Sequence, residues 1–400
     1  MAAKPITVNA DRKSYAAYLD AAWGLKNYWY PALFSHELPE GGVKGVEIAG
    51  SPILLRRAKG KTYALSDQCV HRGVKLSMKP TCLTDDTVSC WYHGFTYDLN
   101  DGKLVSIVAA PDDPLIGKVR LRTYPVQELK GIIFVFVGDL DYAPTPIEHD
   151  LPFRPPMDQE LRAPHPLDEH TVILGIHRTV NANWRLAVEN GFDPGHVLIH
   201  RDNILILASG RSMALGYRPI NEDAIKAFEG DGPKGLMNMY GSGNYEAVVS
   251  NDRLNFHNTA RSEFKFTGVR TSMFLPGVLM VENFPQPQVA QYEWYVPHDD
   301  KRHEYWQVLA AWCKTKEERE AFEFRFQHYY EPVVLRDFND HDMYARQAMQ
   351  AFYDNGGWDN EALCSLDAVI VGWRQMVARH ARGIQKGPHA SVGHASGDHA

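Results

Sequence analysis

The sequence predicts an α+β chain in which an N-terminal all-β domain precedes a domain built from an antiparallel sheet and helices. Residues 41–138 alternate short β-rich runs with turn signals, which is typical of a small all-β domain. Residues further on mix β-rich runs with helical patterns. Seven prolines lie between residues 139 and 166, and proline neither continues a helix nor donates to a sheet. We therefore expect domains at 25–138 and 167–385, a linker at 139–166 and a disordered tail at 386–400.

Four β-rich runs account for most of the first domain. Turns that contain glycine separate them, and Asn100-Asp101-Gly102-Lys103 is a strong hairpin signal because Asp-Gly accommodates the positive φ angles of a tight turn. The four runs are VEIAGSPILLRR, KTYALS, VRLRTYPVQEL and GIIFVFV. Together they predict short strands joined by tight turns.

The second domain shows three further β-rich runs and two helical patterns near the C-terminus. The β-rich runs are TSMFLPGVLMVENF, QYEWYVP and EYWQVLAAWC, and the helical patterns are EEREAFEFRFQHYYEPVVL and NEALCSLDAVIVGWRQMVARHARG. This mixture predicts a sheet covered by helices.

Composition and charge narrow the class of protein. The 400 residues are 44% hydrophobic and 23% charged, which suits a globular chain with substantial cores. The formal net charge of −7 argues against a nucleic-acid-binding protein, which usually has a basic surface. The five cysteines are an odd number and widely spread, so we expect free thiols in a reducing compartment. No segment has the pattern of a signal peptide or a membrane span, and we expect a cytoplasmic location without membrane contact.

Two short motifs in the first domain carry metal-ligand side chains. Cys69-Val70-His71 and Cys90-Trp91-Tyr92-His93 are separated by the eighteen residues 72–89, enough for a hairpin that brings the two loops together. Two thiolates and two imidazoles from converging loops are the ligands of a Rieske-type [2Fe–2S] cluster, with both histidines on one iron. Cys2His2 also suits zinc, but zinc motifs usually keep cysteines and histidines in separate pairs. The motifs thus predict a Rieske cluster, with a zinc site as the alternative.

A second metal site is indicated before residue 201. His196 and His200 are four positions apart, which would place both imidazoles on one face of a helix that begins at Asp193 and Pro194. Alone, two histidines at this spacing are a weak signal, but a redox cluster in the same chain needs an electron acceptor. Non-haem iron oxygenases bind their iron through two histidines and one carboxylate. The candidates for that carboxylate are Asp337, Asp340 and Asp342, and spacing alone does not choose among them.

With these motifs, the chain resembles the large subunit of the Rieske non-haem iron ring-hydroxylating oxygenases over residues 25–385. The segments NWRLAVENGFDPGH and FLPGVLMVENFPQP and the pattern around Phe338 and Asn339 carry the resemblance. It implies that Asp193 connects a cluster histidine with an iron histidine of the neighbouring subunit in a homotrimer. The implied ligands are Cys69, His71, Cys90 and His93 for the [2Fe–2S] cluster, and His196, His200 and Asp342 for a mononuclear Fe(II).

The resemblance further implies a substrate pocket beside the mononuclear iron. Gly191 would offer its carbonyl oxygen to a substrate N–H, and Asp193 and Asn339 would take part in catalysis. Thr271 and Gly268 stand where related carbazole oxygenases have bulkier or more apolar side chains, which bears on ring orientation. For each apolar residue, ordinary core packing is the alternative. The pocket is expected to be lined by Gly191, Phe192, Val197, Thr271, Leu279, Val281, Phe284 and Phe338.

The function implied by the resemblance is angular dioxygenation of a fused heteroaromatic such as carbazole, with both atoms of O2 inserted. Electrons would come from NAD(P)H through a reductase and a ferredoxin, because the chain shows no flavin or nicotinamide motif. The alternatives are a Rieske monooxygenase or demethylase, a dioxygenase that performs lateral cis-dihydroxylation, and a non-catalytic Rieske electron carrier.

Overall fold

The computed structural model describes residues 12–151, 167–193, 195–200, 202–205, 234–236, 243–250, 253–260, 270–282, 284–286, 288–364 and 367–388. The chain divides into two compact units. The smaller unit comprises the described residues of 23–147, 297–299 and 385–400, and the larger unit comprises those of 1–22, 148–296 and 300–384. Three separate stretches thus build the smaller unit, which the sequence pattern did not indicate.

The smaller unit is all-β, as predicted. Its described strands form a four-stranded sheet in the order β2-β3-β4-β8 and two three-stranded sheets in the orders β1-β10-β9 and β5-β6-β7. The strands are β1 (Tyr28–Phe34), β2 (Val43–Ile48), β3 (Ser51–Ala58), β4 (Lys61–Ser66), β5 (Thr87–Ser89), β6 (Phe95–Asp98), β7 (Leu104–Ile107), β8 (Thr123–Tyr124), β9 (Val126–Leu129) and β10 (Ile132–Val137). Short 3-10 helices are η2 (Ser35–Glu37) and η3 (Leu76–Met78).

The hairpin predicted at the Asp-Gly sequence is confirmed between β6 and β7. Gly102 has a φ of +72°, and its N–H donates to the Asp98 carbonyl at 3.0 Å. A Cβ added at Gly102 would stand 2.2 Å from the carbonyl oxygen of Leu121, so only glycine fits this turn. The hairpin packs on a core that includes the buried side chains of Cys69 and Cys90.

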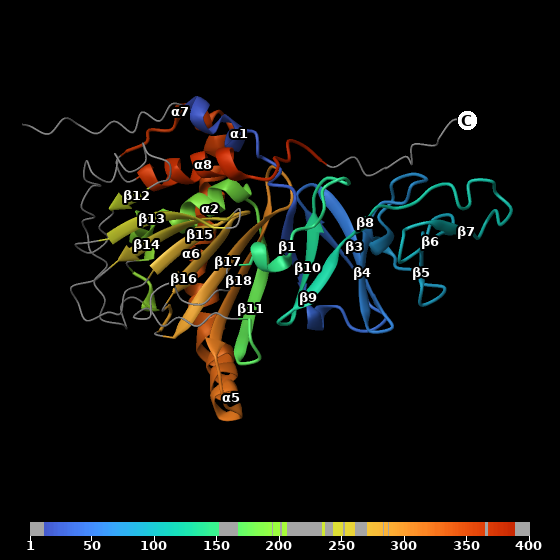
Figure 1. Cartoon of the computed structure of the whole chain (residues 1–400), viewed down its shortest axis with the longest axis horizontal. Helices are drawn as coiled ribbons and strands as arrows, with labels where there is room; N and C mark the ends of the chain where they lie inside the picture. Colours follow the sequence, from blue (N-terminus) through green and yellow to red (C-terminus); the bar gives the residue numbers. More distant parts are fainter. Residues whose placement is uncertain are drawn as a thin grey trace, which may run out of the picture. The chain divides into compact units, whose positions relative to one another are not determined.

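The larger unit is built on an eight-stranded sheet, with the described strands in the order β11-β18-β17-β16-β15-β14-β13-β12 (Figure 1). The order from β18 to β12 follows the chain backwards, as expected for strands joined by hairpins. The strands are β11 (Thr171–Val180), β12 (Lys234–Leu236), β13 (Gly243–Ser250), β14 (Arg253–Ala260), β15 (Arg270–Phe274), β16 (Val278–Glu282), β17 (Val289–Pro297) and β18 (His303–Trp312). The predicted α+β class is therefore confirmed.

Helices cover part of this sheet (Figure 1). Helix α2 packs against α6, α8 and strand β16, and α5 projects away from the sheet. The α-helices are α1 (Ala16–Leu19), α2 (Trp184–Phe192), α5 (Lys316–Arg325), α6 (Asn339–Asp354), α7 (Gly357–Asn360) and α8 (Ala368–His380). The 3-10 helices are η1 (Arg12–Tyr15), η4 (Ile147–His149) and η5 (His196–His200), and η6 (Phe326–Phe338) is a π-helix.

The prediction that an α-helix begins at Asp193 and carries both histidines is wrong. The α-helix instead ends there: α2 begins after Asn183, whose side chain accepts from the Arg185 N–H, and it stops at Phe192. The histidines follow on the short 3-10 helix η5. The Asp193 carboxylate does accept from the Gly195 N–H at 2.6 Å, so this residue caps the turn that precedes η5.

The two C-terminal helical patterns are confirmed in type but not in extent. The first continues from α5 through η6 into α6, although Pro332 lies inside it. Proline lacks the N–H that an α-helix needs at this point, and the surrounding residues adopt the wider π-helical winding. The second helical pattern starts later than predicted. Residues 361–364 are not helical, and α8 begins at Ala368.

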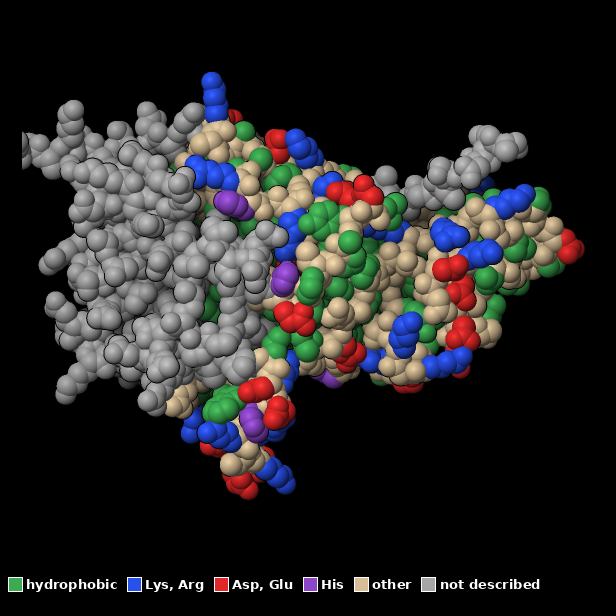
Figure 2. All heavy atoms as spheres, viewed as in Figure 1, with side chains coloured by type: hydrophobic (Ala, Val, Ile, Leu, Met, Phe, Trp, Pro, Cys, Tyr) green, Lys and Arg blue, Asp and Glu red, His purple; other side chains and the backbone are tan. Residues whose placement is uncertain are grey.

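Charged side chains are mixed over the described part of the face shown in Figure 2. Lysine and arginine lie among aspartate and glutamate there, and do not gather in one basic surface. None of the helices in the described ranges combines the length and the apolar character that a membrane span requires.

Candidate metal centres

The two cysteine loops of the smaller unit repeat the same backbone arrangement. Gly73 donates to the Cys69 carbonyl at 2.8 Å, and Gly94 donates to the Cys90 carbonyl at 2.9 Å. Both glycines have left-handed φ angles, +70° and +71°. Each loop therefore reverses direction four residues after its cysteine, which explains why glycine follows each motif.

The four predicted cluster ligands converge at these loops. Cys69 and Cys90 are buried, whereas His71 is exposed and His93 half-buried. The Nδ1 atoms of the two histidines lie 3.1 Å apart, and the His71 ring stacks on Phe95 with centroids 4.8 Å apart. Two buried thiols beneath two outward imidazoles fit a cluster that needs sulfur ligands on one iron and nitrogen ligands on the other.

Tyr97 joins this group, although the sequence analysis did not identify it. Its hydroxyl lies 3.1 Å from the Cys69 sulfur and accepts from the Val70 N–H at 3.2 Å. Burial raises the pKa of the Cys69 thiol, and the Tyr97 hydroxyl opposes that rise because it donates to the thiolate. Its position two residues after Phe95 on β6 gave no chemical signal in the sequence.

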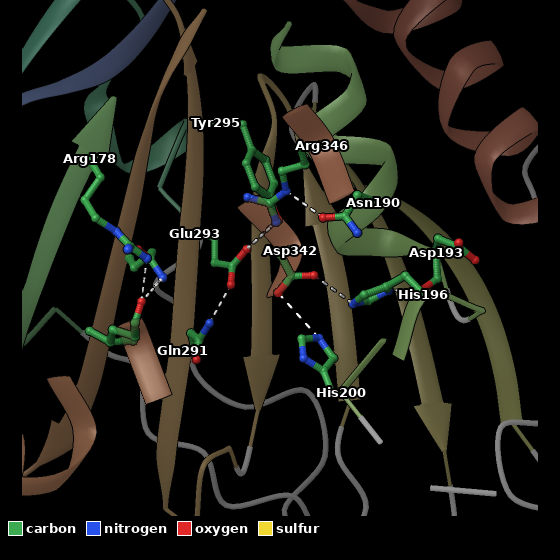
Figure 3. A network of polar contacts seen from close by, with 12 residues as sticks. Arg178, Asn190, Asp193, His196, His200, Gln291, Glu293, Tyr295, Asp342 and Arg346 are labelled. Atoms are coloured by element: carbon green, nitrogen blue, oxygen red, sulfur yellow. Dashed lines mark hydrogen bonds and ion pairs between the residues drawn. The ribbon is translucent and has the colours of Figure 1, made fainter. Parts of the chain in front are cut away.

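The larger unit brings together His196, His200 and Asp342 (Figure 3). One possible ligand atom from each lies within 4.8 Å of the other two. The Nε2 atoms of His196 and His200 each stand 3.5 Å from a different oxygen of the Asp342 carboxylate. Figure 3 shows all three side chains pointing into one space between η5 and α6.

The burial of these groups fits a bound cation. His200 is 1% exposed and Asp342 4% exposed. Among the described residues, both ring nitrogens of His200 and one oxygen of Asp342 have no hydrogen-bond partner. Such atoms cost about 1–3 kcal/mol each when left unpaired. Burial raises the pKa of Asp342, but the facing His200 and His196 outweigh it and hold that pKa below its ordinary value. A dication would bind the His200 Nε2 atom and a carboxylate oxygen of Asp342 together.

The orientation of His196 leaves its Nε2 atom free to bind a metal. Its Nδ1 atom is hydrogen-bonded to the Asp193 carbonyl oxygen, and a carbonyl can only accept, so Nδ1 carries the proton. The lone pair then lies on Nε2, facing Asp342. Metal-binding histidines are usually oriented in this way, by a hydrogen bond from the ring nitrogen that does not bind the metal. The Asp193 carboxylate itself points away from the three side chains (Figure 3).

The structure separates the three candidate aspartates. Asp337 is exposed and accepts from the side chain of Asn203 at 2.8 Å, and Asp340 is exposed and pairs with Arg178. Asp342 alone of the three is buried beside the histidines.

An apolar wall stands beside these groups. The Phe338 ring stacks on His200 with centroids 3.8 Å apart, and Phe284 meets Phe338 at 5.6 Å. Leu279 is buried and Val281 half-buried, and their spacing of two on β16 puts them on one face of the sheet. The structure describes three further members of the predicted pocket. Gly191 and Phe192 lie at the end of α2. Asn339 lies one turn before Asp342 on α6, and its side chain is 1% exposed.

Two predicted pocket residues, Thr271 and Val197, are only partly described. Thr271 pairs with Val281 across β15 and β16, which puts it on the same face, but its side chain lies outside the described residues. The Val197 side chain and the whole of Gly268 also lie outside them.

A buried polar group behind Asp342 was missed by the sequence analysis. Arg346 is 0% exposed and lies beside Glu293, with 3.8 Å between nitrogen and oxygen (Figure 3). Glu293 accepts from Gln291 and from the Tyr295 hydroxyl, both at 2.5 Å. The sequence contained one usable signal, the i, i+4 spacing of Asp342 and Arg346 on a single helix.

Comparison with known proteins covers almost the whole chain. Residues 28–125 match the family described as the Rieske [2Fe-2S] domain, and residues 136–385 match the homotrimeric ring hydroxylase family. The chain is 40% identical over 393 residues to the terminal oxygenase component of carbazole 1,9a-dioxygenase from Metapseudomonas resinovorans, covering 95% of this chain and 97% of that protein.

Solved structures agree with this assignment. A structure of a 2-oxoquinoline 8-monooxygenase component superposes with a TM-score of 0.83 at 44% identity, covering 96% of this chain and 93% of that one. The terminal oxygenase of carbazole 1,9a-dioxygenase from Novosphingobium sp. KA1 superposes with a TM-score of 0.79 at 36% identity, covering 93% and 97%. The chain therefore belongs to the homotrimeric ring hydroxylase family and is a Rieske non-haem iron oxygenase, whose cofactors are a [2Fe–2S] cluster and a mononuclear iron.

Proposed function

We propose that this oxygenase inserts both atoms of O2 into a fused heteroaromatic such as carbazole by angular dioxygenation. The observation that carries the proposal is the set of His196, His200 and Asp342 beside an apolar wall of aromatic and aliphatic side chains. The 40% identity to carbazole 1,9a-dioxygenase over 95% of the chain supports the substrate class. An apolar wall of this kind suits a planar, largely apolar ring.

We assign the cofactors to the two groups of residues described above. Cys69, His71, Cys90 and His93 would hold the cluster, and His196, His200 and Asp342 would hold the mononuclear iron. When bound, the cluster supplies single electrons and the mononuclear iron activates O2. The donor types fit each group, since thiolates and imidazoles suit the cluster, and two imidazoles with one carboxylate suit Fe(II).

The end of α2 offers the substrate one polar contact. The Gly195 N–H would continue the helix by donating to the Gly191 carbonyl, but it donates to the Asp193 carboxylate instead. Without this helical hydrogen bond, the Gly191 carbonyl would accept from a ring N–H of the substrate. Phe338 and Phe284 would exclude water from the same space, and a dry site strengthens each polar contact inside it.

Asp193 is assigned a positioning role between the two metal centres. Its backbone carbonyl already orients His196. Its carboxylate points away from His196, His200 and Asp342 (Figure 3), and we propose that it meets a cluster histidine of a neighbouring subunit in the homotrimer. Asp193→Asn should keep both metal centres filled and nearly abolish product formation. Iron analysis and the cluster absorption spectrum serve as controls, and wild-type turnover in this variant would remove the bridging role.

The electron donors are assigned by analogy with the relatives. Several of the similar structures are complexes of a carbazole 1,9a-dioxygenase oxygenase with its ferredoxin. We propose that a ferredoxin reduces this protein as well and is itself reduced by an NAD(P)H-dependent reductase. We also retain a cytoplasmic location as a prediction.

Turnover of carbazole under 18O2 tests the proposed reaction. With reductase and ferredoxin supplied, the product should carry two labelled oxygen atoms for each molecule of carbazole consumed. If the protein consumes NAD(P)H and O2 without adding oxygen to carbazole, the proposed substrate is wrong. Carbazole recovered unchanged while naphthalene is dihydroxylated would indicate the lateral reaction instead.

A second candidate function is monooxygenation of a nitrogen heteroaromatic. The observation that favours it is the 44% identity to 2-oxoquinoline 8-monooxygenase, which exceeds the identity to the carbazole relatives reported above. A substrate of that class also carries a ring N–H for the Gly191 carbonyl. The same labelling experiment with 2-oxoquinoline separates the two candidates, because a monooxygenase adds one labelled atom and a dioxygenase adds two.

A further inference from the structure

A fully buried arginine stands one helical turn behind Asp342. Arg346 is 0% exposed, and it lies on the same face of α6 as Asp342 because the two are four residues apart. Burying a guanidinium costs free energy unless charges or hydrogen bonds replace its water. The contacts that Arg346 makes must therefore replace the water that its guanidinium has lost.

The hydrogen bond of Arg346 reaches across to another helix. Its Nε atom donates to the side-chain oxygen of Asn190 on α2 at 2.6 Å, whereas its two terminal nitrogens make no hydrogen bond in the described part of the chain. Its guanidinium lies over the ring of Tyr305 at 4.3 Å and over that of Tyr295 at 5.1 Å. One directed bond, to Asn190, thus fixes the orientation of a group otherwise held by rings and by the charge of Glu293.

That bond acts on the end of α2, which leads through Asp193 to His196. The Asp193 N–H closes the last turn of α2 on the carbonyls of Glu189 and Asn190, at 2.8 and 3.2 Å. The Asp193 carbonyl then accepts from His196. A short chain of contacts therefore runs from Arg346 on α6 through the end of α2 to one of the proposed iron ligands, while Asp342 lies on the same helix as Arg346 (Figure 3).

We propose that Arg346 is a positioning residue of the mononuclear iron site: by donating to Asn190, it fixes the end of α2 against α6 and so sets the separation of His196 from Asp342. The proposal rests on the assignment of these two residues as iron ligands. His196 and Asp342 are 146 positions apart in the sequence, so no local structure can set their separation. A cross-helix bond that begins one turn from Asp342 and ends near the C-terminus of α2, six residues before His196, can.

Iron affinity tests this role without using turnover. In the purified holoenzyme, mild chelation removes the mononuclear iron, and Fe(II) is titrated back while its nitric oxide adduct is followed by electron paramagnetic resonance. Arg346→Met and Asn190→Leu should each weaken Fe(II) binding about 10–100-fold, the range known for contacts that orient metal ligands. The double variant should bind no more weakly than either single variant, because both remove one bond. The cluster absorption should not change.

Two further variants separate positioning from general stability. Asn190→Asp keeps an acceptor for the Arg346 Nε–H and should bind Fe(II) about as well as the wild type, which decides the question even if Arg346→Met does not fold. Arg374→Met removes an equally buried arginine that binds Glu189 on the same helix at 2.8 Å. It should lower the melting temperature and leave Fe(II) affinity unchanged.

Distinct results would overturn the proposal. Unchanged Fe(II) affinity in folded Arg346→Met and Asn190→Leu would show that the bond is structural only. An equal loss of affinity in Arg374→Met would show that any loosening of α2 suffices. If the wild type itself binds no third iron, the proposed metal site fails, and the role of Arg346 fails with it.

Discussion

The most direct test of how the site is packed is Gly191→Ala. A Cβ built on Gly191 would stand 1.9 Å from the hydroxyl oxygen of Tyr295 and 3.0 Å from its ring carbon Cζ. Ordinary contact needs about 3.4 Å, so the hydroxyl would have to retreat by about 1.5 Å. That movement breaks its 2.5 Å hydrogen bond to Glu293, which is buried.

The free-energy change follows from three contributions. Overpacking costs about 1–3 kcal/mol, and a lost hydrogen bond to a buried charged group costs about 1.5–3 kcal/mol. Alanine in place of glycine inside a helix returns about 1 kcal/mol. The variant should therefore be destabilised by about 1.5–5 kcal/mol. For a unit of this size, a central value of about 3 kcal/mol corresponds to a melting temperature lower by about 6–12 °C.

Circular dichroism melts of the holoenzyme at fixed protein concentration measure this loss, and a second substitution tests its cause. Tyr295→Phe removes the hydroxyl that the new methyl group would strike, so Gly191→Ala should cost less in that background than in the wild type, by about 1–2 kcal/mol. Additive effects, or a Gly191→Ala protein as stable as the wild type, would refute the contact between α2 and Tyr295.

Three other outcomes are expected. His200→Ala should lower the iron content from three atoms per chain to two and leave the cluster absorption intact, as measured by iron assay and visible spectrum. Tyr97→Phe removes the hydroxyl beside the Cys69 sulfur; a bond worth about 0.5–1.5 kcal/mol corresponds to a reduction potential lower by about 20–65 mV, as measured by redox titration. Arg374→Met should destabilise the protein by about 3–5 kcal/mol because it leaves the buried Glu189 carboxylate without its ion-pair partner, and an unchanged melting temperature would contradict this.

The parts of the molecule that the sequence predicted well are those in which the information is local. The hairpin at Gly102 and the two cysteine loops each depend on residues within about six positions, and positive-φ glycines stand where the motifs require them. The order of the two domains also followed from local patterns of β-rich and helical runs. The assignment of Cys69 and Cys90 as cluster ligands, which stays a prediction, rests on the same kind of local motif.

The mononuclear site depends on long-range packing, and there local patterns were insufficient. The spacing of His196 and His200 suggested an α-helix, yet the helix ends at Asp193, because the residue before a proline favours the extended backbone that Asp193 adopts. The Asp193 carboxylate then takes the Gly195 N–H that would have continued the helix. The choice of Asp342 over its neighbours followed from the family resemblance and not from spacing. In the structure the difference is burial, which a sequence window around residue 340 does not reveal.

Strand β17 shows why the polar residues behind the site were missed. Its sequence alternates Gln291, Tyr292, Glu293 and Trp294, which in an antiparallel sheet usually indicates a polar face in water and an apolar face in the core. Every residue of β17 is nevertheless buried. The register pairs Gln291 with Val281 and Glu293 with Leu279, so the polar face of β17 and part of the predicted pocket lie on one side of the sheet. A buried carboxylate is stable only with partners, and Glu293 has the Tyr295 hydroxyl and Arg346. An alternating pattern of polar and apolar residues can therefore mark a buried polar site as well as a solvent-exposed face.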